Sequence, residues 1–140
     1  MPTIEPYLYF NGNAAEVMRW YAEVLGADPP VIMTYGESPE PNTCAPGDEN
    51  RVMHALLKVE GAAIMASDVP SSMPYTPFAS FSIAIAYKTA AEAEVLYKQL
   101  SVGATLVQMP LQQTFWADAF AMLVDRYGVM WSISGGNKSG

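Results

Sequence analysis

Apolar and polar residues alternate along this chain in two series that predict the same order of elements twice. In each series, a run of β-branched and aromatic residues predicts a strand, an amphipathic segment predicts a helix, and three further runs predict strands. The predicted strands span residues 7–10, 31–35, 53–60 and 62–66 in the first half, and residues 81–87, 105–109, 120–127 and 129–134 in the second half. The predicted order is therefore β-α-β-β-β, repeated once.

Both predicted helices carry start signals, and both are followed by a glycine that can end them. In the first half, Asn13 is placed to cap the helix, Glu16 completes a capping-box pattern, and Gly26 supplies a left-handed stop. In the second half, Thr89 and Glu92 form the same capping-box pattern. The sequence Ala-Ala-Glu stands at the start of both helices, so the two halves resemble each other in residues as well as in pattern.

Segments rich in proline and glycine separate and end these elements. Residues 36–51 predict a loop whose length is typical of functional or disordered segments, residues 67–77 predict a linker, and residues 134–140 predict a flexible tail. We therefore expect one α+β domain over residues 1–140, made of modules at about residues 3–68 and 78–134. A single module cannot bury both faces of its sheet, so we expect two curved mixed sheets around a cavity.

Composition and charge exclude several classes of protein. The chain is 51% hydrophobic and 15% charged, which is typical of a globular protein. Its apolar runs are too short for a membrane span and its start lacks a secretory signal, so we expect a cytoplasmic protein. The net charge of −7 without a basic cluster argues against nucleic acid as a partner. Cys44 is the single cysteine, which excludes an internal disulfide and favours an inert thiol.

His54 and Asp118 are the candidate catalytic residues. His54 is the one histidine of the chain, and it could act as a general base or hydrogen-bond a ligand. The alternative is a partly buried histidine whose nitrogens are satisfied by backbone groups. Asp118 could pair with His54 or bind a polar group of a ligand, and its alternative is a solvated position at a strand end.

Aromatic side chains offer a platform on which a planar or apolar ligand could bind. Tyr7 and Tyr9 share one face of the first strand, but the sequence does not tell which face lines the cavity. Packing in the core or in a dimer is the alternative for the tryptophans, and capping of a strand-to-loop turn is the alternative for the Ser67–Asp68 pair. The candidate ligand-binding residues are Tyr7, Tyr9, Ser67, Asp68, Phe115, Trp116 and Trp131.

Five separate motifs resemble those of one known family. They are residues 6–14 (PYLYFNGNA), 52–55 (VMHA), 65–68 (MASD), 113–117 (QTFWA) and 125–131 (DRYGVMW). In order and spacing they are similar to PhnB-like proteins, also called 3-demethylubiquinone-9 3-methyltransferase-like, of the vicinal oxygen chelate superfamily. The resemblance runs from about residue 4 to residue 134 and implies the glyoxalase/bleomycin resistance fold and a homodimer. Members range from metalloenzymes to drug-sequestering proteins, so it leaves the activity open.

The sequence lacks the residues that would bind the cofactors used by such proteins. Enzymes of the superfamily hold a divalent metal with His and Glu side chains from the first and last strands of each module. The corresponding segments here, residues 7–10, 64–66, 82–85 and 130–133, contain neither histidine nor a carboxylate, whereas such a metal needs about three ligands. A glycine-rich strand-to-helix turn, expected of an enzyme that uses S-adenosylmethionine, is also missing.

The sequence therefore predicts a cofactor-free protein, without the usual metal triad, that binds a small organic molecule in an aromatic-lined cavity. Two alternatives stay open. One is an enzyme, lyase-like or oxygenase-like, that uses His54 and Asp118 and a weakly held divalent metal. The other is a structural or interaction dimer without catalysis.

Overall fold

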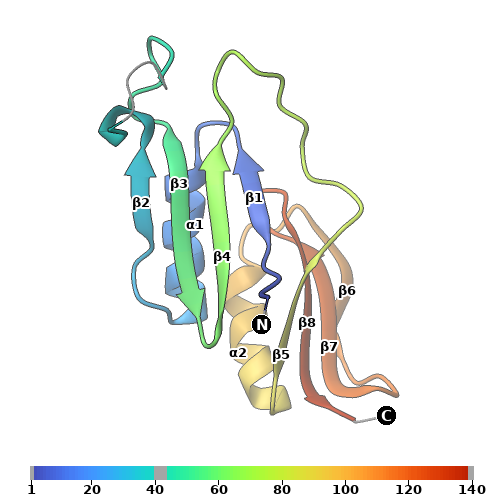
Figure 1. Cartoon of the computed structure of the whole chain (residues 1–140). Coiled ribbons are helices and arrows are strands. Elements are labelled where there is room, and N and C mark those ends of the chain that lie inside the picture. The colour runs from blue at the N-terminus through green and yellow to red at the C-terminus, as the bar shows by residue number, and fades with distance from the viewer. Residues whose placement is uncertain (1, 40–43, 139–140) are drawn as a thin grey trace. The chain divides into compact units, whose positions relative to one another are not determined.

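The predicted order of elements occurs twice in the computed structural model, which describes residues 2–39 and 44–138 (Figure 1). The chain divides into two units between Thr76 and Pro77, and each unit carries one α-helix and one mixed four-stranded sheet. The α+β class with two βαβββ modules is thereby confirmed.

Unit 1 begins with β1 (Tyr7–Phe10), α1 (Ala14–Leu25) and β2 (Val31–Thr34). A short 3-10 helix, η1 (Tyr35–Glu37), follows, and then the hairpin of β3 (Val52–Val59) and β4 (Ala62–Asp68). The strand order is β1-β4-β3-β2, with β1 parallel to β4 and the other pairs antiparallel. Gly61 makes the turn of the hairpin with a φ of 76°, as its position in the sequence predicts.

Alternation along the strands decides which side chains α1 covers. Leu8 and Phe10 point toward the helix and are buried, as are Val17 of α1 and several small residues of β3 and β4. Tyr7 and Tyr9 alternate to the other face, where they are 37% and 53% exposed. We call this side of the sheet, opposite α1, the open face of unit 1. Among its side chains, related by strand register, are Tyr7, Tyr9, Met33, His54, Leu56, Met65 and Ser67.

The start of α1 differs from the prediction. Asn13 makes no side-chain cap, and its backbone (φ −116°, ψ 16°) is not in the extended conformation of a capping residue, so the predicted box with Glu16 is wrong. Instead, the carboxylate of Asp68 at the end of β4 accepts hydrogen bonds from the N–H groups of Gly12 and Ala14. A residue distant in sequence thus performs the role that the local pattern assigned to Asn13.

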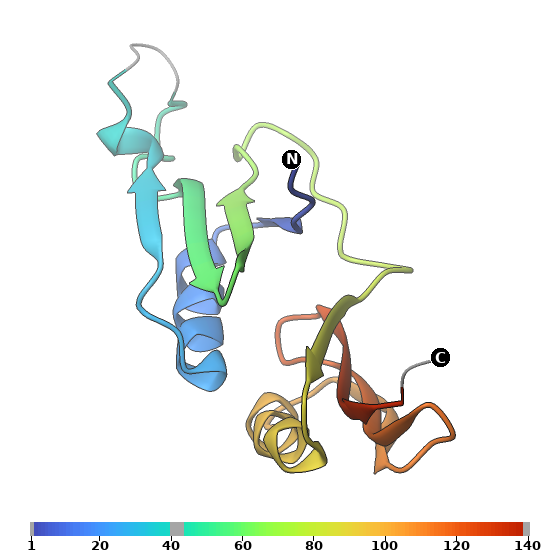
Figure 2. The ribbon, with the colours of Figure 1, turned by 60° about the horizontal axis from the view of Figure 1, so that its bottom comes forward.

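Unit 2 repeats this plan with β5 (Ile83–Tyr87), α2 (Ala90–Leu100), β6 (Leu106–Gln112), β7 (Ala117–Val124) and β8 (Met130–Asn137). The strand order is β5-β8-β7-β6, and β5 is parallel to β8. Helix α2 covers one face of this sheet (Figure 2). Its capping box, formed by Thr89 and Glu92, is confirmed. Neither helix of the described part of the chain is long and apolar enough to cross a membrane.

The last two strands differ from the prediction in their bounds. β7 begins at Ala117 rather than at residue 120, and β8 continues to Asn137, so the prediction of a flexible tail is wrong for residues 135–137. Gly135 pairs with Tyr87 and Ala119 inside the sheet. A Cβ atom at Gly135 would collide with the carbonyl oxygen of Thr89. The glycine that suggested flexibility therefore allows α2 to approach the strand closely.

Candidate functional site

Three of the candidate residues lie together on the open face of unit 1. The rings of Tyr7 and Tyr9 are stacked with their centroids 5.1 Å apart, and the centroid of the Tyr7 ring lies 5.7 Å from that of the His54 imidazole. The Tyr7 hydroxyl is 2.9 Å from Nδ1 of His54, a hydrogen-bond distance. We call Tyr7, Tyr9 and His54 the tyrosine–histidine cluster. Ser67, which pairs with Tyr9, is buried beside it.

The register of the sheet brings this cluster together. β4 lies between β1 and β3, and Tyr7 pairs with Met65, which in turn pairs with Leu56. His54 lies two residues from Leu56 and therefore on the same face, within reach of the long Tyr7 side chain across β4. Met33 of β2 pairs with His54 on the other side. The cluster is thus bordered by the side chains of Met33, Leu56 and Met65. Sequence reasoning missed these three apolar residues, although alternation from His54 would have identified Leu56.

Asp68 has a different environment from its neighbour Ser67. It is 1% exposed, and its carboxylate accepts three backbone hydrogen bonds of 2.8 to 3.0 Å, from Gly12, Ala14 and Val52. Its backbone carbonyl also accepts a hydrogen bond from the Tyr35 hydroxyl, and burial together with the charge of Asp68 raises the pKa of Tyr35. This geometry supports the capping interpretation of Asp68. A ligand-binding role for Ser67 and Asp68 stays a prediction.

Charged side chains form hydrogen bonds that join the loop before β3 to the segment that follows β4. Arg51 donates hydrogen bonds of 2.6 and 3.0 Å to the carbonyl of Val69 and one of 2.9 Å to Oδ1 of Asn11. Asp48 is buried and accepts a hydrogen bond of 3.0 Å from the N–H of Ser71. Hydrogen bonds from Ser71 hold the pKa of Asp48 below its usual value. The predicted loop at residues 36–51 is therefore anchored at its end, while residues 40–43 lie outside the described residues.

A second group of aromatic side chains lies in unit 2, at the turn between β6 and β7. Phe115 is 87% exposed and meets Trp116 edge to face, with ring centroids 4.8 Å apart. Trp116 also meets Phe120 of β7 at 5.2 Å. Sequence reasoning missed Phe120, although it follows Trp116 by four residues and so lies on the same strand face. This group is more exposed than the tyrosine–histidine cluster and contains no titratable side chain.

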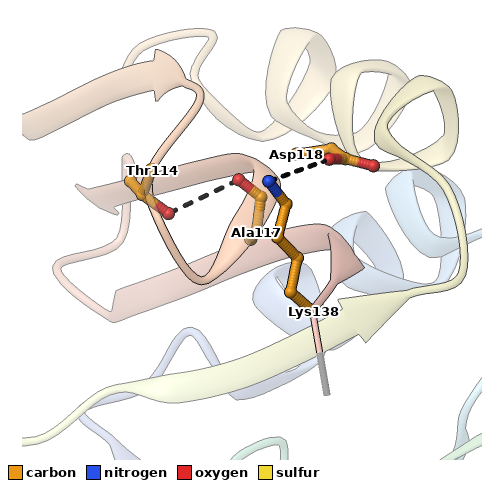
Figure 3. A network of polar contacts seen from close by, with 4 residues as sticks. All are labelled: Thr114, Ala117, Asp118 and Lys138. Atoms are coloured by element: carbon orange, nitrogen blue, oxygen red, sulfur yellow. Dashed lines mark hydrogen bonds and ion pairs between the residues drawn. The ribbon is translucent and has the colours of Figure 1, made fainter. Parts of the chain in front are cut away.

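Asp118 lies beside Lys138 at the ends of β7 and β8 (Figure 3). Its carboxylate is 4.0 Å from the Lys138 ammonium group, and both side chains are about half exposed. The turn before it is closed by Thr114, whose N–H and hydroxyl groups donate to the Ala117 carbonyl. His54 belongs to unit 1 and Asp118 to unit 2, so a pairing between them and a catalytic role for either stay predictions.

Trp131 is placed by a buried carboxylate. It is 1% exposed, and its indole N–H donates a hydrogen bond of 2.9 Å to Asp125. Asp125 also accepts hydrogen bonds from the backbone N–H groups of Tyr127 and Val129 and so fixes the turn between β7 and β8. The motif at residues 125–131 is thus explained by folding. This geometry favours the packing interpretation of Trp131, the alternative that the sequence left open.

The donor set of the described residues does not fit the divalent metal of the superfamily's enzymes. Within residues 2–39 and 44–138, no three His, Cys, Asp or Glu side chains are grouped so that they could hold a metal ion. On the open face of unit 1, Nδ1 of the one imidazole faces a phenol, and the neighbouring side chains named above carry thioether, aliphatic and hydroxyl groups but no second imidazole, carboxylate or thiolate. Zinc or iron would need about three nitrogen, carboxylate or thiolate ligands.

Comparisons with known proteins agree with one another. The family model described as 3-demethylubiquinone-9 3-methyltransferase matches residues 2–134. The crystal structure of protein PA1353 from Pseudomonas aeruginosa is 40% identical with a TM-score of 0.88, covering 99% of this chain and 100% of that one. A putative 3-demethylubiquinone-9 3-methyltransferase, PhnB protein, from Bacillus cereus is 27% identical with a TM-score of 0.69, covering 96% and 99%. A glyoxalase/bleomycin resistance protein from Albidiferax ferrireducens shares the fold at 13% identity and a TM-score of 0.60, covering 93% and 96%.

Proposed function

Because this chain belongs to the 3-demethylubiquinone-9 3-methyltransferase family, as a PhnB-like member of the glyoxalase/bleomycin resistance/dioxygenase superfamily, we propose that it binds a small organic molecule on the open face of unit 1. The observation that carries this proposal is the tyrosine–histidine cluster, in which two stacked phenols and an imidazole face away from the helix. The predicted aromatic-lined cavity would have this face as a wall.

The chemistry of the open face suits a planar, mostly apolar ligand. Stacked phenol rings offer a flat surface on which another ring can stack, and such aromatic contacts contribute about 0.5–1.5 kcal/mol beyond the burial of area. Met33 and Met65 border the cluster with flexible, polarisable side chains that adapt to different ligand shapes. The hydroxyl and imidazole groups add the few polar contacts that orient a ligand in an apolar site.

The proposal is binding rather than methyl transfer, despite the description of the family model. The connection from β1 to α1 contains a single glycine, Gly12, and its N–H is already bonded to Asp68, as is the N–H of Ala14 at the helix start. Two of the backbone donors that a cofactor would use at a strand-to-helix turn are therefore engaged within the fold. We likewise propose no metal-dependent step, since the donor set of the described residues does not fit a catalytic metal.

A ligand screen observed on the protein by NMR tests this proposal. The methyl signals of Met33 and Met65 report on the open face, and a panel of planar aromatic metabolites should shift them. Tyr9→Ala should weaken binding about tenfold, because it removes one of the two stacked rings. Phe81→Ala is the matched control, an exposed aromatic residue of unit 2. Equal affinity in wild type and Tyr9→Ala, or shifts confined to the Trp116 region, would contradict the proposal.

We also propose that the chain forms a homodimer, as its family resemblance implies. Light scattering coupled to gel filtration measures this directly. A mass equal to one chain across the concentrations used for ligand binding would refute it, and would leave the binding proposal unaffected.

A further inference from the structure

We infer that Tyr7 fixes His54 as a hydrogen-bond donor, so that the tyrosine–histidine cluster selects ligands that present an oxygen acceptor, such as a carbonyl group. The geometric basis is the distance of 2.9 Å between the Tyr7 hydroxyl and Nδ1 of His54. That contact determines which ring nitrogen carries the proton. The position of the proton in turn determines whether the histidine can donate a hydrogen bond to a ligand or accept one from it.

The direction of this hydrogen bond follows from the two groups. A phenol has one O–H donor, and its oxygen is a weak acceptor because its lone pair is delocalised into the ring. The unprotonated nitrogen of a neutral imidazole is a strong acceptor in the ring plane. The Tyr7 hydroxyl therefore donates to Nδ1, and the single proton of the neutral imidazole must lie on Nε2.

The Nε2–H group is free to meet a ligand. His54 is only partly buried on the open face, and within residues 2–39 and 44–138 its Nε2 makes no hydrogen bond. A protonated imidazole would carry a proton on Nε2 as well, so this nitrogen is a donor in both charge states. A ligand atom placed at Nε2 must therefore be an acceptor.

Two functions are disfavoured by the same tautomer. A histidine with its proton on Nε2 cannot accept a ligand's proton there, which argues against His54 as a general base toward a molecule on the open face. It also cannot coordinate a metal through Nε2 without first losing that proton, while Nδ1 is taken by Tyr7. Tyr7 is thus a positioning residue, and His54 is a specificity-determining one.

The tautomer can be measured without any ligand. Because the chain has one histidine, long-range proton–nitrogen NMR correlation of the uniformly labelled protein shows one imidazole without assignment ambiguity. At a pH where the ring is neutral, Nδ1 should appear as the unprotonated nitrogen and Nε2 as the protonated one. Tyr7→Phe should release the ring into a mixture of both tautomers, and Tyr9→Phe should not. A protonated Nδ1 in wild type, or an unchanged spectrum in Tyr7→Phe, would overturn the inference.

The ligand class rests on the proposed function and has its own test. Acetophenone and α-methylstyrene have the same shape, but only acetophenone carries an acceptor oxygen. We expect acetophenone to bind about twofold to twelvefold more tightly, the range of one net hydrogen bond, and His54→Phe to remove the difference. Equal binding of the two probes would overturn the assigned ligand class. Failure of both to bind, with the expected tautomer observed, would count against the proposed function and leave the role of Tyr7 standing.

Discussion

Loss of the Asp68 side chain should strongly destabilise unit 1. Its buried carboxylate accepts backbone N–H groups from Gly12 and Ala14, at the start of α1, and from Val52, at the start of β3. In Asp68→Ala these donors lose their partner, and each unsatisfied buried donor costs about 1–3 kcal/mol. Water entry and local relaxation recover part of this energy. We therefore expect a loss of about 3–5 kcal/mol, a large part of the about 5–15 kcal/mol that stabilises a typical domain.

Urea unfolding followed by circular dichroism measures this loss, and hydrogen exchange locates it. The amides of Ala14 and Val52 should exchange faster in Asp68→Ala, because their acceptor is gone. Asp68→Asn keeps one acceptor oxygen and should give an intermediate loss. Asp28→Ala, which removes an exposed carboxylate, should change stability by less than about 0.5 kcal/mol. A loss below about 1 kcal/mol in Asp68→Ala, or unchanged exchange at both amides, would refute the assigned role.

Three further predictions concern other parts of the chain. Gly135→Ala should lower the free energy of unfolding by about 1–3 kcal/mol, because its Cβ would strike the Thr89 carbonyl; an unchanged melting temperature would show that α2 adjusts freely. The pKa of Asp48 is lower in the folded than in the unfolded chain, so its hydrogen bond to Ser71 stabilises the fold above pH about 4 and is lost as the pH falls through the lowered value. The Ser71 amide signal should therefore titrate with a midpoint below the ordinary pKa of an aspartate side chain, and a midpoint at or above that ordinary value contradicts the contact. Desolvation and nearby carboxylates raise the pKa of Cys44, so iodoacetamide should alkylate it more slowly at pH 8 than it alkylates the same thiol in urea, and equal rates would argue otherwise.

The sequence predicted the order of the elements well because the signals for that order are local. Thr89 and Glu92 lie three residues apart and form their capping box without help from the rest of the chain. Gly61 and Gly128 both adopt positive φ at the two hairpin turns. Such features depend on neighbours in sequence, which a reader of the sequence can see.

What the sequence could not show depends on pairing between distant segments. The capping of α1 by Asp68 requires that the end of β4 lies beside the β1–α1 connection, and no local pattern encodes this. The contact between Tyr7 and His54 likewise requires that β4 separates β1 from β3. Alternation predicted that Tyr7 and Tyr9 share a face, but only the position of α1 shows that this face lies opposite the helix.

In each unit the first strand pairs in parallel with the last strand, and this pairing has a consequence for synthesis of the protein. β1 emerges from the ribosome well before β4, the strand with which it pairs, and β5 likewise emerges well before its partner β8. Before β4 is synthesised, the sheet against which α1 packs is incomplete, and Leu8 and Phe10 are exposed and prone to aggregation. Each nascent unit should therefore bury its apolar residues in one late step, when its last strand, β4 or β8, becomes available for pairing.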